Sequence, residues 1–340
     1  MTPIRAFIIQ PLDRIPPHRL GEPMHKEFYG FTEEPFGLTP DPRFFFLTEN
    51  HKEVIDSLIF GIGERDGLAL LTGESGLGKT TLIQQMLLML PSHIVAVPIF
   101  HPKKTFDDLL EIILQQLNLL GQERDRNSML SQFNDFLYRK SARGEIIAIF
   151  VDEAQELSAG VLEELRLLCN PDPRRPRLLK EVFVGTPQLE EKLNFPELRQ
   201  LNQRITTRRR LKPMTEDESW HYIMHRLTKA EKDASEIFTP EAILLICRNA
   251  KGIPQSLNTI CHAALFIGYL LKQTRIDSPL IQKILPLFGG PKSGRWQRLR
   301  DSLRSSAARL AKIPLITKIS LLLLAYSLLA WIIFFLLTLK

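Results

Sequence analysis

Eight consecutive residues leave this chain few possible folds: Gly73-Glu74-Ser75-Gly76-Leu77-Gly78-Lys79-Thr80. They fit the pattern G-x-x-x-x-G-K-[ST], with an apolar run at 68–72 before them and a helical pattern at 81–90 after them. Glycines let backbone N–H groups wrap a polyphosphate closely, and the helix adds the positive end of its dipole. The sequence therefore predicts a strand, a phosphate-binding loop and a helix, rather than a Gly-rich turn that matches by chance.

The predicted ligands of this loop are ATP and Mg²⁺. Lys79 is expected to reach the β- and γ-phosphates and to take part in catalysis, and Thr80 to place its hydroxyl on Mg²⁺. The remaining predicted nucleotide contacts come from the loop and the start of the helix: Gly73, Glu74, Ser75, Gly76, Leu77, Gly78 and Thr81.

Apolar runs alternate with helical patterns through the first two thirds of the chain. The predicted strands are 93–97, 145–151, 178–184 and 207–211, in addition to 68–72. Strands too apolar to have a wet face indicate a parallel sheet covered by helices on both sides, an α/β fold. After Pro213 only helical patterns follow, and they predict a small all-helical lid: 216–232, 240–249, 255–271 and 279–288.

A second motif, this one acidic, follows the predicted strand 145–151. Asp152 is expected to hold the Mg²⁺ shell, and Glu153, one residue later, to orient and polarise an attacking water. An Asp-Glu pair after a strand is by itself as easily a surface feature. Together with the phosphate loop it predicts a nucleotide hydrolase.

Several motifs together resemble one family, the AAA+ ATPases of general secretion pathway protein A, the ExeA-like group. The resemblance covers about residues 24 to 288, and an N-terminal block of aromatic residues and prolines is its more specific part. The matching motifs are Phe28-Tyr29-Gly30, Pro35-Phe36, Thr39-Pro40-Asp41-Pro42, the phosphate loop, Asp152-Glu153-Ala154-Gln155, Gln203-Arg204-Ile205 and Gly252-Ile253-Pro254.

The resemblance implies three further site residues and a homo-oligomer. Thr186 falls at the sensor position, where the family commonly has Gln, and its hydroxyl has a shorter reach. Arg204 falls at the arginine-finger position that acts on the neighbouring subunit's nucleotide, although an Arg in a basic loop is the alternative. Gln255 stands where the family often has the lid's sensor Arg, and a neutral amide supplies no positive charge to the transition state. Slow turnover, or a partner that completes the site, is therefore expected.

The predicted domain order is a flexible extension (1–23), the AAA+ ATPase domain (24–212), the helical lid (213–290), a basic juxtamembrane segment (291–318) and a transmembrane helix (319–339). Residues 1–23 do not resemble a secretory signal, and translation could start at Met1 or at Met24. The aromatic block is expected to pack on the nucleotide domain. Three cysteines without a C-x-x-C pair are predicted to be buried, reduced thiols: Cys169, Cys247 and Cys261.

The net charge of +6 is concentrated next to the predicted membrane segment. Between residues 292 and 318, eight Lys or Arg face only Asp301, and Lys340 adds one charge, so these residues carry +8 and the rest of the chain carries −2. The globular part therefore has no excess of positive charge for a nucleic-acid backbone, and nucleic acid is not an expected partner.

Residues 319–339 contain no charged side chain. A helix of this length rises about 31 Å, close to the hydrocarbon thickness of a bilayer. Alternatively, the segment is a helix buried in a protein core or covered by a large partner. The basic residues before the segment predict a single pass through the inner (cytoplasmic) membrane with the N-terminal body in the cytoplasm. Since little sequence follows, no periplasmic domain of the family is expected.

These observations predict a membrane-anchored ATPase, and the resemblance implies that it drives or regulates an envelope assembly, with secretion as the family's example. An inner-membrane partner protein is possible under this hypothesis. The main alternative is a nucleotide-dependent switch that recruits protein partners or DNA with little turnover, as transposition regulators of this ATPase group do. A third hypothesis is a scaffold with an inactive site. The predicted catalytic and metal-binding residues are all intact, which argues against it: Lys79, Thr80, Asp152 and Glu153.

Overall fold

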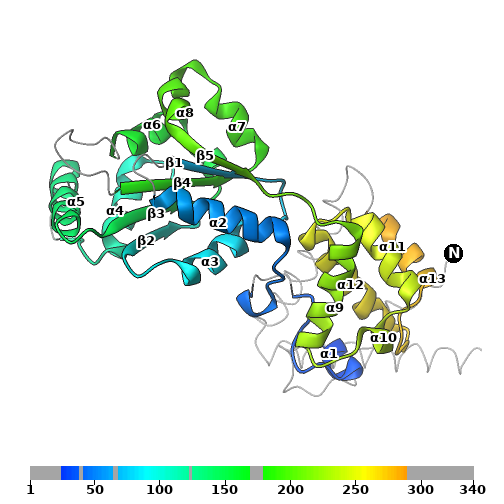
Figure 1. Cartoon of the computed structure of the whole chain (residues 1–340). Coiled ribbons are helices and arrows are strands. Elements are labelled where there is room, and N and C mark those ends of the chain that lie inside the picture. Colours follow the sequence, from blue (N-terminus) through cyan, green and yellow to red (C-terminus); the bar gives the residue numbers. More distant parts are fainter. Residues whose placement is uncertain (1–23, 38–40, 64–67, 122–124, 169–178, 289–340) are drawn as a thin grey trace, which may run out of the picture. The chain divides into compact units, whose positions relative to one another are not determined.

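The computed structural model describes residues 24–37, 41–63, 68–121, 125–168 and 179–288. Within them, a five-stranded parallel sheet has the strand order β2-β3-β4-β1-β5 (Figure 1). Its strands are β1 (Leu68–Thr72), β2 (Ile94–Ile99), β3 (Ile146–Val151), β4 (Leu179–Gly185) and β5 (Ile205–Arg210). The expectation of a parallel α/β sheet is confirmed.

Side chains alternate between two apolar cores, one on each face of the sheet. In β1, Leu68 and Leu70 enter one core, whereas Ala69 and Leu71 enter the other. Because successive strand residues point to opposite faces, a strand with both faces covered must be apolar throughout. This explains why β1 and β3 are buried along their whole length.

Helices cover both faces. The face with Ala69 and Leu71 packs against α2 (Glu49–Gly63) and α3 (Lys79–Met89). The other face packs against α4 (Phe106–Gln116), α5 (Arg126–Ser141), α6 (Ala159–Leu168), α7 (Pro187–Leu193) and α8 (Arg199–Arg204). The hydroxyl of Thr105 accepts from the backbone N–H of Asp108, as expected for an N-cap of α4.

The differences from the predicted element boundaries have local causes. β2 continues through Pro98 to Ile99, because β2 is an edge strand in this sheet and an edge strand tolerates proline. α4 ends at Gln116, and two residues later Asn118 adopts a left-handed conformation with φ 55°, which stops the helix.

The second helical group follows β5, as the lid was expected to do. It comprises α9 (Glu216–Lys229), α10 (Ala234–Ile237), α11 (Pro240–Ala250), α12 (Pro254–Leu270) and α13 (Ser278–Ile284), with a 3₁₀ turn at Leu285–Leu287. Thr215 and Glu218 form a reciprocal capping box at the start of α9. Cys247 and Cys261 are buried free thiols, as predicted, and Cys169 lies outside the described residues.

The N-terminal aromatic block packs on both parts: Phe45 lies against the core of α2, α3 and the sheet, as expected, whereas other aromatic residues of the block pack on these lid helices, which was not expected. It begins with α1 (Met24–Tyr29) and includes a 3₁₀ turn at Pro42–Phe44. Phe28 meets Tyr269, Phe36 meets Phe238, and Phe46 meets Tyr222. The sequence of the block alone did not indicate these partners, because they lie far away along the chain.

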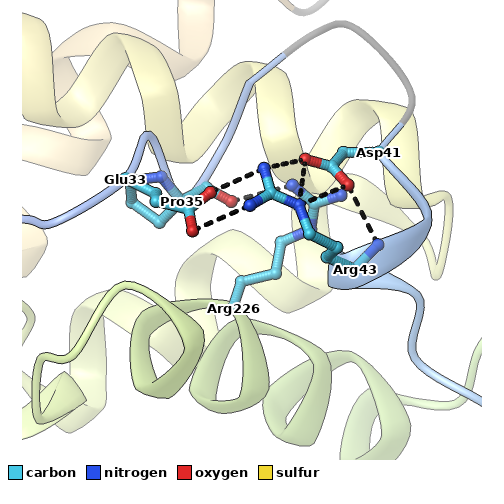
Figure 2. A network of polar contacts seen from close by, with 5 residues as sticks. All are labelled: Glu33, Pro35, Asp41, Arg43 and Arg226. Atoms are coloured by element: carbon cyan, nitrogen blue, oxygen red, sulfur yellow. Dashed lines mark hydrogen bonds and ion pairs between the residues drawn. The ribbon is translucent and has the colours of Figure 1, made fainter.

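A buried arginine fastens the same segment to α9. Arg226 is 8% exposed, and its Nη1 donates to the carbonyl oxygen of Pro35 at 2.8 Å (Figure 2). Its guanidinium also lies over the Phe44 ring, 5.2 Å from the ring centroid. Beside it, Arg43 forms ion pairs with Asp41 and Glu33. The aromatic block and α9 therefore form one packed unit.

The predicted transmembrane helix at 319–339 and the juxtamembrane segment at 291–318 lie outside the described residues. Among the residues that are described, we find no helix with the length and apolar character needed to cross a bilayer.

Candidate functional site

The phosphate-loop motif connects β1 to α3 at the carboxyl end of the central strands. Gly76 and Gly78 have φ values of +82° and +89°, which are strained for residues with a side chain. Leu77 is buried in the core beneath and anchors the loop, whereas Glu74 and Ser75 are exposed. The loop thus has the left-handed glycines that the motif requires.

Lys79, the first residue of α3, lies across this loop. Its Nζ donates to the carbonyl oxygens of Gly73 at 2.8 Å and Glu74 at 3.2 Å. Lys79 is 5% exposed, and this burial lowers its pKa, while the charges of Glu153 and Asp152 oppose the change. The ammonium group is thus held near the loop by neutral carbonyls, without a carboxylate bound directly to it in these contacts.

Thr80 and Asp152 meet although 72 positions separate them. The Thr80 hydroxyl donates to a carboxylate oxygen of Asp152, the residue that directly follows β3. Asp152 is 2% exposed, and its burial raises its pKa above the usual range. A hydroxyl and a carboxylate side by side provide the oxygen ligands that Mg²⁺ prefers. Thr81 is half-buried one residue further along α3.

Glu153 adopts a left-handed backbone conformation, with φ 49° and ψ 37°. Such a conformation is uncommon for a residue with a side chain and is found preferentially at functional sites. Its carboxylate accepts a hydrogen bond from Nε2 of Gln155, and Oε1 of Gln155 accepts from the backbone N–H of Thr186 at 3.1 Å. Gln155 therefore links the end of β3 to the end of β4.

Gln155 is the residue that sequence reasoning missed. It belongs to the Asp152-Glu153-Ala154-Gln155 motif, but no role was predicted for it. The available signal was its position two residues after Glu153. The 3₁₀ turn Ala154–Glu156, which brings the side chain back to that carboxylate, has no clear sequence signature.

The hydroxyl of Thr186 is buried and makes no hydrogen bond within the described part of the chain. Thr186 occupies the N-cap of α7, yet its side chain does not cap the helix. A buried hydroxyl without a partner is costly unless a ligand or water satisfies it. This group fits a phosphate oxygen or an ordered water.

Gln255, in the first turn of α12, lies against the phosphate loop. Its backbone N–H donates to the Gly76 carbonyl at 3.2 Å. A Cβ at position 76 would lie 2.5 Å from Oε1 of Gln255, so the glycine is needed for this close approach as well as for its φ. The lid therefore contacts the loop through a neutral side chain.

Arg204 ends α8 and lies beside α6, where its Nη1 donates to the carbonyl oxygen of Arg166 at 3.3 Å. Its predicted role concerns the nucleotide of a neighbouring subunit, and that role stays a prediction. The other predicted residues gather at the carboxyl ends of β1, β3 and β4, where open parallel sheets bind their ligands.

The residues present fit a magnesium–nucleotide complex. The left-handed glycine loop offers space above Gly78, where an added Cβ would meet nothing within 4 Å. The Thr186 hydroxyl, for which the described residues offer no partner, and the Thr80–Asp152 pair provide oxygen groups suited to such a ligand.

Comparison with known proteins agrees with this geometry. A family model described as "AAA domain" matches residues 62–193. General secretion pathway protein A of Aeromonas hydrophila is 37% identical over 247 residues, which cover 72% of this chain and 45% of that protein. The chain thus spans less than half of the length of this relative.

Solved structures share the fold at low identity. Cdc6p from Pyrobaculum aerophilum has a TM-score of 0.56 and 16% identity, covering 70% of this chain and 68% of that chain. The ORC1 protein of Aeropyrum pernix, solved in complex with DNA, has the same TM-score and identity and covers 85% of this chain and 75% of its own. These solved structures show only that the fold is shared. The phosphate loop, the AAA domain match and the 37% identity together identify the chain as an AAA+ P-loop ATPase related to general secretion pathway protein A.

Proposed function

We propose that this protein binds Mg²⁺-ATP at the carboxyl edge of its sheet and hydrolyses it. The observation that carries the proposal is the meeting of Lys79, Thr80, Asp152 and Glu153 at one edge, from elements far apart in the sequence. Bound Mg²⁺ would neutralise charge on the β- and γ-phosphate oxygens.

In this proposal each side chain has a distinct task. Thr80 and Asp152 hold the cation, and Lys79 exchanges its carbonyl contacts for phosphate oxygens. Glu153 orients the attacking water, and the Thr186 hydroxyl donates to the γ-phosphate or to that water. Gln155 fixes the direction of the Glu153 carboxylate.

The proposed assembly is a homo-oligomer in which Arg204 reaches the nucleotide of the next subunit. An arginine supplied from a neighbour stabilises transition-state charge in many NTPases. This part rests on the match of Gln203-Arg204-Ile205 to the family pattern.

We further propose that residues 319–339 anchor the protein in the inner membrane, with the ATPase body in the cytoplasm. The support is the uncharged 21-residue segment and the eight basic residues on its N-terminal side. The relatedness to a general secretion pathway protein suggests an envelope assembly of the secretion type as the machine that ATP turnover drives or regulates.

A nucleotide-dependent switch that recruits protein partners is the second candidate. It is favoured by one observation: the lid residue on the phosphate loop is the neutral Gln255. Without a positive charge from the lid, bound ATP would persist, and the ATP-bound form itself would be the signal.

ATP turnover of the full chain in detergent micelles, measured across protein concentrations, tests both candidates. Glu153→Gln is the blank, and Arg204→Ala is compared with Arg199→Ala, an exposed arginine on the same helix. Turnover per subunit should rise with concentration and be lost in Arg204→Ala but not in Arg199→Ala. Tight ATP binding with turnover no higher than the blank would reject the hydrolase and leave the switch.

A further inference from the structure

A cluster of two histidines and a glutamate lies away from the phosphate loop. His25 comes from α1, Glu34 from the segment after it, and His262 from the middle of α12. Nε2 of His25 lies 2.9 Å from Oε2 of Glu34, and Nδ1 of His262 lies 3.4 Å from Oε1 of Glu34. One donor atom from each residue can be chosen so that all three lie within 4.8 Å of one another.

The cluster is largely buried, and both histidines lie within ion-pair distance of the Glu34 carboxylate. His25 is 2% exposed, and its Nε2 and the facing Oε2 of Glu34 are buried without a hydrogen bond of acceptable geometry to any described residue. The rings of His25 and His262 stand edge to face with centroids 5.2 Å apart, and the Phe266 ring stands edge to face to His25 at 6.3 Å. A buried carboxylate that faces two imidazole nitrogens needs positive charge beside it, either a proton on a ring or a cation, and a metal ion supplies that charge.

We propose that His25, Glu34 and His262 bind one Zn²⁺ ion. Two imidazole nitrogens and one carboxylate oxygen are a common zinc ligand set, and tetrahedral bonds of about 2.0–2.2 Å place ligand atoms about 3.3 Å apart. His25 faces Oε2 of Glu34 at 2.9 Å and His262 faces Oε1 at 3.4 Å, and one donor atom from each of the three residues lies within 4.8 Å of the other two, so small side-chain shifts bring the set to that spacing. His262 is 34% exposed, so water has access to the fourth position.

The nitrogen ligands set this site apart from the proposed Mg²⁺ site. Imidazole suits zinc, whereas Mg²⁺ takes oxygen ligands and keeps several waters. The two sites therefore select different cations, and zinc binding here does not depend on the ATPase proposal.

Zinc at this site ties the N-terminal aromatic block to α12. The block already contacts α9 through the bond from Arg226 to Pro35 (Figure 2). The ion would add a second joint, through Glu34 beside Pro35 and through His25 of α1. Because the first turn of α12 contacts Gly76, the ion bridges the block and the helix that touches the phosphate loop.

Zinc titration of the EDTA-treated full chain in micelles, in competition with a chromophoric chelator, tests this site. One Zn²⁺ should bind per chain, and His262→Gln and Glu34→Gln should each weaken the affinity at least about tenfold. His225→Gln, a half-buried histidine on α9 outside the cluster, and Asp152→Asn, in the proposed Mg²⁺ site, should keep it.

A second measurement separates loss of the site from loss of the fold. Zinc should slow hydrogen exchange of the amides in residues 25–34 of the native chain and leave that exchange unchanged in His262→Gln, whose partly exposed position tolerates substitution. The proposal is overturned if no zinc binds at micromolar concentration, or if binding is equal in His262→Gln and His225→Gln. Loss of binding in Asp152→Asn alone would assign the zinc to the nucleotide site and reject it here.

Discussion

Acid should lower the folding stability of this protein by protonating His51, a buried histidine at the start of α2. The backbone N–H of Thr48 donates to Nδ1 of His51 at 3.1 Å, and the N–H of His51 donates to Oγ1 of Thr48 at 3.2 Å. This reciprocal pair is a capping box in which histidine replaces the usual Glu or Gln. Because Nδ1 must accept, the cap requires the unprotonated ring.

Burial lowers the pKa of His51 to about 4, although the charge of Glu218 on α9 acts in the opposite direction. With an unfolded pKa of about 6.5, the folded state binds fewer protons between pH 4 and 6.5. The stabilising contribution of the neutral ring is therefore complete above pH 6.5 and is lost as the pH falls toward 4. The loss amounts to about 2 kcal/mol at pH 5 and about 3 kcal/mol in total.

His51→Gln isolates this contribution, because Gln at the same position completes a conventional capping box and does not titrate. Urea unfolding of both full chains, followed by circular dichroism, gives the difference in unfolding free energy at each pH. We expect a difference under about 1 kcal/mol at pH 7.5 and a relative gain for the variant of about 2 kcal/mol at pH 5. A wild type and a variant that lose stability in parallel would refute the reasoning.

Three further substitutions test other parts of the structure. Gln155→Ala should lower kcat about 10- to 100-fold with little change in KM, because the Glu153 carboxylate loses the bond that orients it. Gln155→Glu should not restore activity, and an unchanged kcat in Gln155→Ala would show that Gln155 has no role in the site. Gly252→Ala should destabilise the chain by about 2 kcal/mol or more in thermal unfolding, because φ is +72° and the new Cβ would lie 2.0 Å from the Met214 carbonyl oxygen. The matched control is Gly63→Ala, whose added Cβ would meet nothing within 4 Å. Arg226→Ala should lower the free energy of unfolding by about 2–4 kcal/mol, measured in urea, because the guanidinium lies over two aromatic rings and donates to a buried carbonyl oxygen. A decrease below about 1 kcal/mol would contradict this account.

Local sequence was sufficient for the elements whose cause is local. The phosphate loop is readable because its glycines must adopt positive φ and its lysine and threonine have fixed offsets from them. The buried strands are readable because a parallel sheet covered on both faces needs continuous apolar runs.

Contacts between distant segments could not be read in the same way. The aromatic block has no local signal for its partners, which lie about 200 positions away in α9 to α12. The link from Glu153 through Gln155 to Thr186 depends on the ends of β3 and β4 lying side by side, and strand order is not written in any single strand.

The sequence alone therefore determined the fold class, the phosphate loop and the acidic pair, because each depends on residue types at short spacing. Only the tertiary structure decided that Gln255 rests on Gly76, that Gln155 bridges two strand ends, and that His25, Glu34 and His262 meet. The physical reason is that side chains on separate elements acquire a common position only when the cores on both faces of the sheet, and between the lid helices, have packed.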